Sequence, residues 1–358
     1  MSQHFLLSKK ARDFSLIKLL NWSDDDYFNF LKNIKFKGEG STVCSECGAI
    51  KPPRFLKTRK QWRCRDCDRS FSLFSGTVLA NSKLTLRKIV LAMYLYSSET
   101  KGISMSQLSR DIDVSYKTAF TLLHKFKEAI TQTEDLTPLK GHVQIDGGHF
   151  GGKPRSGQFR RVGKPEDIVA KIKLGKSQGA KRSRISRANL ERKKRNRRII
   201  INLRQLGPKG TGAVRTICRV AMAEDEKHVM SLIRRFVEPG TYIETDESSA
   251  YLQCSLGYKH ETVQHSTEYS TIDGVNNNQA ESFFSRIRRW EYGVSHRMEA
   301  KYMQDYANEF AWRENTRRYT QLEKLRCLAE KVLTSGLSRW WCGYWQGIKR
   351  DDEMLWEA

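Results

Sequence analysis

Four cysteines near the N-terminus constrain the folding of this chain more than any other feature. Cys44 and Cys47 form one C-x2-C pair, Cys64 and Cys67 form a second, and 16 residues separate the two pairs. In a reducing compartment such pairs supply four thiolates for a tetrahedral Zn²⁺ ion rather than two disulfides. A small core of reduced cysteines is the weaker alternative, because few aliphatic residues lie in this segment and metal binding would supply most of its folding free energy. We therefore predict a structural zinc ribbon over residues 41–76.

The large positive net charge of the chain indicates what kind of molecule it binds. The 358 residues carry a formal charge of +24, with a pI near 9.8, and an excess of this size predicts a polyanionic partner, in the first place nucleic acid. An anionic membrane surface is a weaker alternative, because the sequence has no long apolar run and no signal-peptide pattern at its start. We expect a cytoplasmic protein, nucleoid-associated if prokaryotic, that binds DNA and no membrane.

The segment after the ribbon has the pattern of a helix-turn-helix module. Apolar spacing predicts a helix over Thr85–Glu99, a short helix capped by Ser104, and a longer helix over Tyr116–Ile130. In that geometry Lys117 and Lys125 of the last helix could reach a DNA groove. A three-helix packing module that never touches DNA is the alternative.

Beyond this module the pattern changes to strands. One strand, His142–Asp146, ends in an aspartate; two more follow at Arg197–Gly207 and Thr211–Met222, and after an amphipathic helix a further strand ends at Asp246. Carboxylates at the ends of neighbouring strands can converge, and Mg²⁺ prefers hard oxygen ligands of this kind. Two such ions activate a water or a 3′-hydroxyl on one side of a phosphodiester and stabilise the leaving oxygen on the other.

A third acid, Glu281, lies in a run with helical spacing. The large apolar residues of this run form one arc at about 100° per residue, and Glu281 falls beside the arc together with Arg288. A surface charge pair on an ordinary amphipathic helix is the local alternative. With 34 residues between Asp246 and Glu281, the order strand, strand, helix favours one shared site.

Four stretches carry a family resemblance: "HVQIDGGHFGGK", "ETDESSAY", "NNNQAESFFSRIRRWEYGVSHR" and "YANEFAWRENTRR". In this order they resemble the ISXO2-like, IS1595-type insertion-sequence transposases, which are DDE-type enzymes. The resemblance implies an α/β fold with a ribonuclease H-like catalytic core, a mixed sheet with flanking helices, preceded by a zinc ribbon and a helical helix-turn-helix-like module. It implies Asp146, Asp246 and Glu281 as catalytic residues and ligands of two Mg²⁺ ions, with Mn²⁺ as an alternative. It also places Arg288 where such enzymes often have a basic residue that meets DNA.

Two departures from the family pattern concern the site itself. The family commonly has an acidic residue after the first aspartate, whereas this chain has Gly147 and Gly148. Some relatives use asparagine as the third ligand, so Asn278 remains an alternative to Glu281, although a carboxylate is the stronger Mg²⁺ ligand. His149 could assist catalysis, but a packing or loop role is the simpler interpretation.

A basic run separates the first two strands of this domain. Residues 153–198 contain 18 lysines and arginines against 3 acids, which favours a nucleic-acid-binding insertion over a solvated loop. Arg195 and Arg197 in this run are candidate DNA contacts, as are Arg286 and Arg289 on the helix of Glu281.

The chain is thus predicted to be a DNA transposase that binds the terminal inverted repeats of an insertion sequence and catalyses metal-dependent strand cleavage and strand transfer. A catalytically silent DNA-binding derivative is the alternative, and a nuclease without strand transfer is a third. Partners would be double-stranded DNA of element ends and target, and a second copy in a dimer or higher assembly. The C-terminal tryptophans would dock on the core or on that copy. The expected segments are an N-terminal helical segment (1–40), zinc ribbon (41–76), helix-turn-helix-like module (80–135), catalytic domain (139–298) and C-terminal helical and aromatic tail (299–358).

Overall fold

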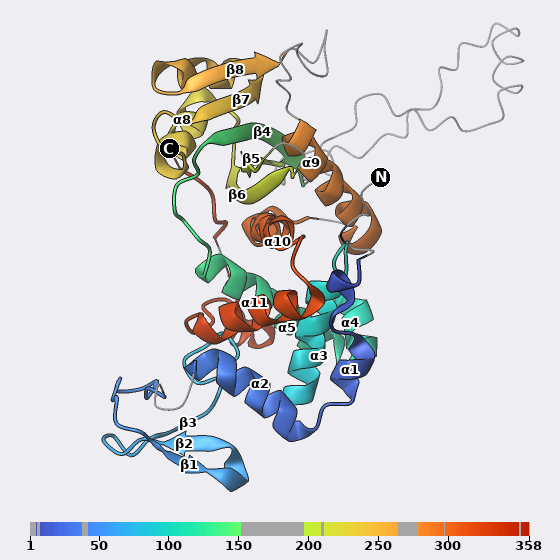
Figure 1. The fold of residues 1–358 in the computed structure, drawn as a ribbon, viewed down its shortest axis with the longest axis vertical. Coiled ribbons are helices and arrows are strands. Elements are labelled where there is room, and N and C mark those ends of the chain that lie inside the picture. Colours follow the sequence, from blue (N-terminus) through green and yellow to red (C-terminus); the bar gives the residue numbers. More distant parts are fainter. Residues whose placement is uncertain are drawn as a thin grey trace, which may run out of the picture.

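The computed structural model of the chain is an elongated α/β molecule in which a mixed sheet and a small ribbon lie at opposite ends and helices fill the space between them (Figure 1). It describes residues 5, 8–37, 42–151, 197–208, 211–263, 278–296, 298–350 and 352–357. No helix within these ranges is long and apolar enough to cross a bilayer.

The N-terminal helices and the ribbon form the end opposite to the sheet (Figure 1). Helix α1 spans Leu16–Leu20 and α2 spans Asp24–Phe36, and Ser23 begins α2 with a reciprocal capping box. The ribbon strands are β1 (Arg54–Leu56), β2 (Gln61–Arg63) and β3 (Ser70–Phe71), paired antiparallel in that order. Trp62 of β2 is buried against aromatic rings of α2, so the ribbon is packed onto the helices.

The helices predicted after the ribbon are present: α3 (Leu86–Ser98), α4 (Met105–Asp111) and α5 (Tyr116–Gln132). Ser104 and Ser115 accept hydrogen bonds from the first turns of α4 and α5, as the capping pattern indicated. The inward faces join one hydrophobic core with α2 and α11 (Gln321–Thr334).

The five-stranded sheet has the order β6-β5-β4-β7-β8. Strands β4 (His142–Phe150), β5 (Arg198–Leu206) and β6 (Ala213–Ala221) are antiparallel neighbours. Strand β7 (Tyr242–Asp246) runs parallel to β4, and β8 (Lys259–Val263) runs parallel to β7. The crossover from β6 to β7 contains helix α8 (Glu226–Phe236).

Two expectations about the strands were wrong. The first strand does not end at Asp146 but continues to Phe150, because Gly147 and Gly148 remain paired with β5. The segment after β7, expected to be a loop up to the helix of Glu281, contains a 3₁₀ segment (Ser249–Leu256) and the edge strand β8.

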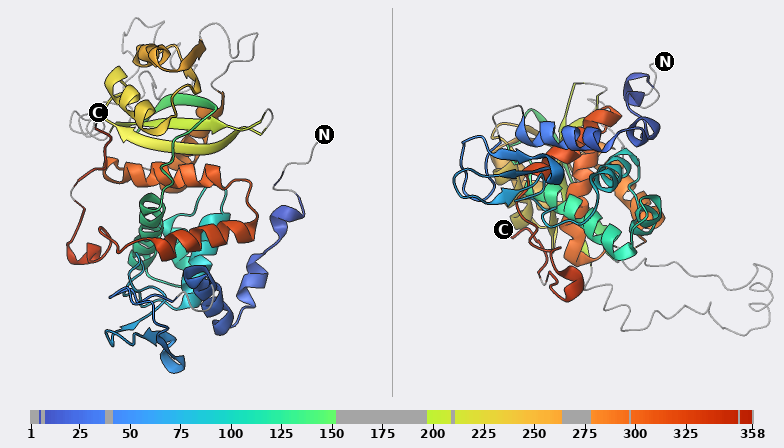
Figure 2. Two further views of the ribbon diagram at one scale, coloured as in Figure 1. Left: turned by 60° about the vertical axis from the view of Figure 1, so that its left-hand side comes forward. Right: turned by 90° about the horizontal axis from the view of Figure 1, so that it is seen from below.

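The sheet separates two hydrophobic clusters, because successive residues of a strand point to opposite faces. One face packs against α8, with Ile145 and Ile201 in its core. The other packs against α9 (Asn278–Trp290) and α10 (Met303–Asn315), where Phe284 and Trp290 are buried. Helix α10 lies between the sheet and the helices of the N-terminal half, as the left view of Figure 2 shows.

The C-terminal segment returns to the helical module. Trp341 is buried and stacks on His124 of α5 with ring centroids 4.1 Å apart, and Trp345 donates a hydrogen bond to the Lys117 carbonyl oxygen. The predicted docking of the aromatic cluster therefore takes place on this chain's own helices.

Candidate active site and zinc cluster

The two aspartates are brought together by the parallel pairing of β4 with β7. The printed register pairs Gln144 with Glu244, and two further residues along each strand reach Asp146 and Asp246. The Gln144 amide donates a 2.7 Å hydrogen bond to the Glu244 carboxylate, so these positions point to the same face. Asp146 and Asp246 therefore lie next to each other where the two parallel strands separate.

Helix α9 brings the third acid to this face. Its apolar arc of Phe283, Phe284, Ile287 and Trp290 is buried, as predicted. The backbone N–H of Gln279 donates a 3.1 Å hydrogen bond to the Gln144 side chain, which fixes the first turn of α9 above β4. Glu281 follows two residues later and acts electrostatically on Asp146.

Burial and neighbouring acids make Asp146 the most perturbed carboxyl of the group. Burial raises the pKa of Asp146 to about 8, and the negative charges of Asp246, Glu224 and Glu281 contribute, against a hydrogen bond from the Gly147 N–H. Burial also raises the pKa of Glu224, together with the charge of Asp246 and against a hydrogen bond from Tyr251. Four acidic groups thus share one region around Asp146.

The chemistry of this donor set fits hard divalent cations. Within the described ranges no lysine or arginine forms an ion pair with Asp146, Asp246 or Glu224, although half-buried carboxylates that repel one another are stabilised by a counter-charge. Carboxylate oxygens are the ligands that Mg²⁺ prefers. The residues present therefore suit the ions that the family resemblance implies.

Asn278, the alternative third ligand, is the first residue of α9 and is exposed. It lies one turn before Glu281, so the condition for a shared helical face is met. The two residues thus share one side of α9, and the charge acting on Asp146 is that of Glu281.

The arginines of α9 divide between two sides of the helix. The Arg288 guanidinium lies over the rings of Phe150 and Phe284, 5.6 and 5.9 Å from their centroids, at the end of β4. Arg289 is exposed. Arg286 points away from the acids, pairs with Glu314 and donates a 2.9 Å hydrogen bond to Ser282.

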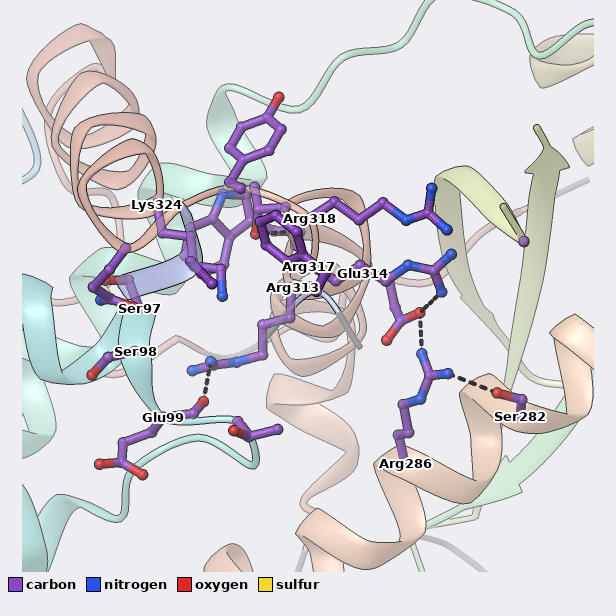
Figure 3. A pocket seen from close by; sticks show the side chains of 18 of the residues that line it. Ser97, Ser98, Glu99, Ser282, Arg286, Arg313, Glu314, Arg317, Arg318 and Lys324 are labelled. Atoms are coloured by element: carbon purple, nitrogen blue, oxygen red, sulfur yellow. Dashed lines mark hydrogen bonds and ion pairs between the residues drawn. The ribbon is translucent and has the colours of Figure 1, made fainter. Parts of the chain in front are cut away.

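A basic cavity of about 960 Å³ adjoins this side of α9 (Figure 3). Its cationic side chains come from three elements: Arg286 from α9, Arg313, Arg317 and Arg318 from the end of α10 and the turn after it, and Lys324 from α11. Two acids, Glu99 and Glu314, also line it. Five cations against two acids give the cavity an excess of positive charge. Burial lowers the pKa of both Arg317 and Lys324, and nearby arginines act in the same direction, whereas the charge of Glu314 opposes the shift at Arg317.

The other predicted DNA contacts are placed as follows. Lys117 is exposed and its ammonium lies 5.4 Å from the Trp345 ring centroid, while Lys125 is half-buried and burial lowers its pKa. Arg197, directly before β5, donates a 3.2 Å hydrogen bond to His149 near the end of β4. Arg195 and nearly all of the basic run lie outside the described residues.

The four cysteines form a compact cluster at the opposite end of the molecule. The sulfurs of Cys44 and Cys67 are 3.8 Å apart and those of Cys47 and Cys64 are 3.7 Å apart, and all four lie within 4.8 Å of one another. A tetrahedron with Zn–S bonds of about 2.3 Å has edges of about 3.8 Å, so the cluster has the dimensions of a structural zinc site.

Sequence reasoning missed Glu224. It follows β6 and begins the acidic run Glu224-Asp225-Glu226, which has the pattern of an ordinary helix start. The absence of the family's acidic residue after Asp146 was the one available signal that another carboxylate could be present.

Comparison with known proteins supports the same two units. Residues 138–315 match the ISXO2-like transposase domain, and residues 22–70 match the transposase zinc-ribbon domain. A protein of Halobacterium salinarum described as an uncharacterized protein in transposable element ISH50 is 35% identical over 120 residues. That alignment spans 33% of this chain and 39% of the relative. From the two domain matches in this order, the chain belongs to the ISXO2-like, IS1595-type transposase family, with a zinc ribbon before its transposase domain.

Proposed function

We propose that this protein is a DDE-type DNA transposase that cleaves DNA at the ends of its element and joins the exposed 3′-hydroxyls to target DNA. The observation that carries the proposal is the convergence of acids from β4, β7 and α9 around the half-buried Asp146 carboxyl. Two divalent ions bound there would activate a water or a 3′-hydroxyl and stabilise the leaving oxygen.

The chain's own contribution would be to hold those ligands in place. Asp146 and Asp246 sit on neighbouring strands of a packed sheet, and Glu281 is fixed by a helix whose apolar face is buried. Rigid positioning of this kind lowers the barrier without a covalent intermediate. The sheet order, with three antiparallel strands followed by two parallel ones, supports a ribonuclease H-like core for the predicted catalytic domain.

The DNA backbone would follow the basic surfaces beside α9. Arg288 lies over Phe150 at the end of β4, Arg289 is exposed, and the cavity with Arg286, Arg317 and Arg318 adjoins the same helix. We propose that these side chains bind phosphates near the cleaved end, since guanidinium groups recognise phosphate oxygens in a bidentate manner. Lys117 and Lys125 of the helix-turn-helix-like module, and Arg195 and Arg197, would extend the contact.

The predicted segments have distinct roles in this proposal. The ribbon and the helix-turn-helix-like module would read the inverted repeats, and the catalytic domain would cut and join. A dimer or larger assembly would hold two element ends together. The C-terminal segment would regulate the access of DNA to α5, because Trp345 contacts Lys117 on that helix.

A strand-transfer assay on pre-cleaved element ends with Mg²⁺ tests the proposal. Asp146→Asn, Asp246→Asn and Glu281→Gln should each abolish joined products while end binding persists. Glu261→Gln on the exposed edge strand β8 is the matched control and should join normally.

Two other outcomes would change the assignment. Activity in Glu281→Gln together with a dead Asn278→Ala variant would make the asparagine the third ligand. Tight end binding with no joining in the unmodified protein, under any divalent ion, would identify a catalytically silent DNA-binding derivative.

A further inference from the structure

We propose that Glu224 is a fourth carboxylate of the catalytic site, a ligand for a divalent cation that reaches Asp146 from the α8 face of the sheet. This inference rests on the proposed function, because it assigns a further ligand to the same reaction. The loop between β6 and α8 supplies the residue.

The first observation is the position of its carboxylate relative to β4. A Cβ atom added to Gly147 would lie 2.2 Å from the Glu224 Cδ and 2.2 and 2.3 Å from its two oxygens. The carboxylate therefore occupies the space that a side chain at position 147 would fill. Gly147 directly follows Asp146, so the Glu224 carboxylate lies beside the residue next to Asp146.

The second observation is the way in which Glu224 is held. Tyr251, which is fully buried in the 3₁₀ segment after β7, donates a 2.6 Å hydrogen bond to Oε1 of Glu224. Among the described residues this tyrosine is the hydrogen-bond partner of the carboxylate, and no cationic side chain there pairs with it. A half-buried carboxylate held by one neutral donor retains lone pairs for a metal ion.

Glycine at position 147 has a clear role in this arrangement. Successive strand residues face opposite sides of a sheet, so the side chain of Asp146 faces α9 and position 147 faces α8. Any side chain there would displace Glu224. Gly147 thus admits an acid from a distant part of the chain, and Asp146 lies between Glu281 on one face and Glu224 on the other.

A purely structural role is the competing explanation. Glu224 could serve only to satisfy the buried hydroxyl of Tyr251, without contact to any ion. That role predicts equal effects from removing either partner of the hydrogen bond, whereas a ligand role predicts that the carboxylate matters far more than the hydroxyl.

The test is Mn²⁺ binding to the full-length, zinc-loaded protein, followed by the electron paramagnetic resonance signal of free Mn²⁺, alongside strand transfer. Glu224→Gln keeps the shape and can still accept the hydrogen bond from Tyr251. We expect it to weaken Mn²⁺ binding about 10- to 100-fold and to reduce joining. Glu226→Gln, two residues further along the same segment, is the control and should leave both unchanged.

A charge relocation makes the test independent of folding defects. In a Glu224→Ala background, Gly147→Asp would place a new carboxylate in the space that Glu224 vacates, so the double variant should regain part of the Mn²⁺ affinity. Gly147→Asp alone should not improve binding, because its side chain would overlap the glutamate. Failure of the double variant to bind better than Glu224→Ala would count against the ligand role.

The outcomes separate this inference from the proposed function. If Asp146→Asn and Asp246→Asn lose Mn²⁺ and joining while Glu224→Gln retains both, the fourth ligand is refuted and the transposase proposal stands. Equal loss of thermal stability in Glu224→Ala and Tyr251→Phe, with normal Mn²⁺ affinity in both, would likewise overturn the ligand role. If none of the aspartate variants affects ion binding or joining, the proposed function fails as well.

Discussion

Replacement of Asp146 by asparagine should stabilise the metal-free protein at alkaline pH. The ordinary pKa of an aspartate is 3.8, and burial with the neighbouring acids raises that of Asp146 to about 8 in the folded chain. The folded state therefore binds a proton more tightly than the unfolded state, and stability is lost as the pH rises from about 4 to about 8. At about 1.4 kcal/mol per pKa unit, the cost of ionising Asp146 in the folded protein is on the order of 5 kcal/mol at pH 8.

The measurement is urea unfolding of the wild type and Asp146→Asn at pH 5 and pH 8, with the ribbon saturated in zinc and without other divalent ions. Chelators must be left out, because they would remove the structural zinc and unfold the ribbon. The difference in unfolding free energy between variant and wild type should grow by several kcal/mol from pH 5 to pH 8. Glu247→Gln, an exposed acid next to Asp246, should show no comparable growth.

Addition of Mg²⁺ provides the second arm of this experiment. The ion should stabilise the wild type at pH 8, by about 2.7 kcal/mol at a hundredfold excess over Kd, and should stabilise Asp146→Asn much less. An equal difference between variant and wild type at both pH values would refute the reasoning. So would a variant that is less stable than the wild type at pH 8.

Three further predictions concern other parts of the molecule. Cys64→Ser should release the zinc and unfold the ribbon, measured as zinc per chain, whereas Cys342→Ser, outside the cluster, should retain the ion. Glu309→Gln should lower the unfolding free energy in urea by about 3 to 5 kcal/mol. The Lys127 side chain is only 3% exposed and its ammonium lies 3.2 Å from the Glu309 carboxylate, so the substitution leaves it without its counter-charge. An unchanged urea midpoint would contradict this. Gly148→Ala should destabilise the chain by about 1 to 3 kcal/mol and reduce strand transfer, since the added Cβ would lie 2.6 Å from an aromatic ring of α9; a normally active and stable variant would show that α9 can shift.

The parts of the fold that follow from local sequence were predicted well. The capping serine of α4, the apolar arc of α9 and the strands β5, β6 and β7 all depend on patterns within about 15 residues. Edge strand β8 was missed because it is short and carries exposed charges, so its pattern resembles that of a loop. Its assignment as a strand comes from pairing with β7.

The proximity of the acids in the candidate site was predictable only for the residues that the motifs contain. Asp146, Asp246 and Glu281 stand at recognisable positions, and the structure places them in one region. Glu224 could not be found in this way, since its relation to Gly147 is a contact between residues far apart in the chain. The extension of β4 to Phe150 was missed for a similar reason, because two glycines look like the end of a strand until the partner strand is known.

Helix α10 carries polar residues that are buried in the interior, among them Gln304 and Glu309. Gln304 hydrogen-bonds the backbone of β6 through both Cys218 and Val220, and Asn315 bonds Thr216 of the same strand. On its other side, Glu309 pairs with Lys127 of α5 in a site that is almost fully buried.

The same helix also connects the two halves of the protein through its last turn. Arg313 bonds the carbonyl oxygens of Tyr96 and Glu99 at the end of α3, and Glu314 accepts hydrogen bonds or ion pairs from Arg204 of β5 and Arg286 of α9. The largely buried groups among them, Arg204, Arg313 and Glu314, must stay paired or incur a large desolvation cost. A relative movement of the sheet and the helical module would therefore break several of these contacts together. Helix α10 therefore links the helical module to the five-stranded sheet, and these paired contacts account for polar residues at positions where packing alone would favour apolar ones.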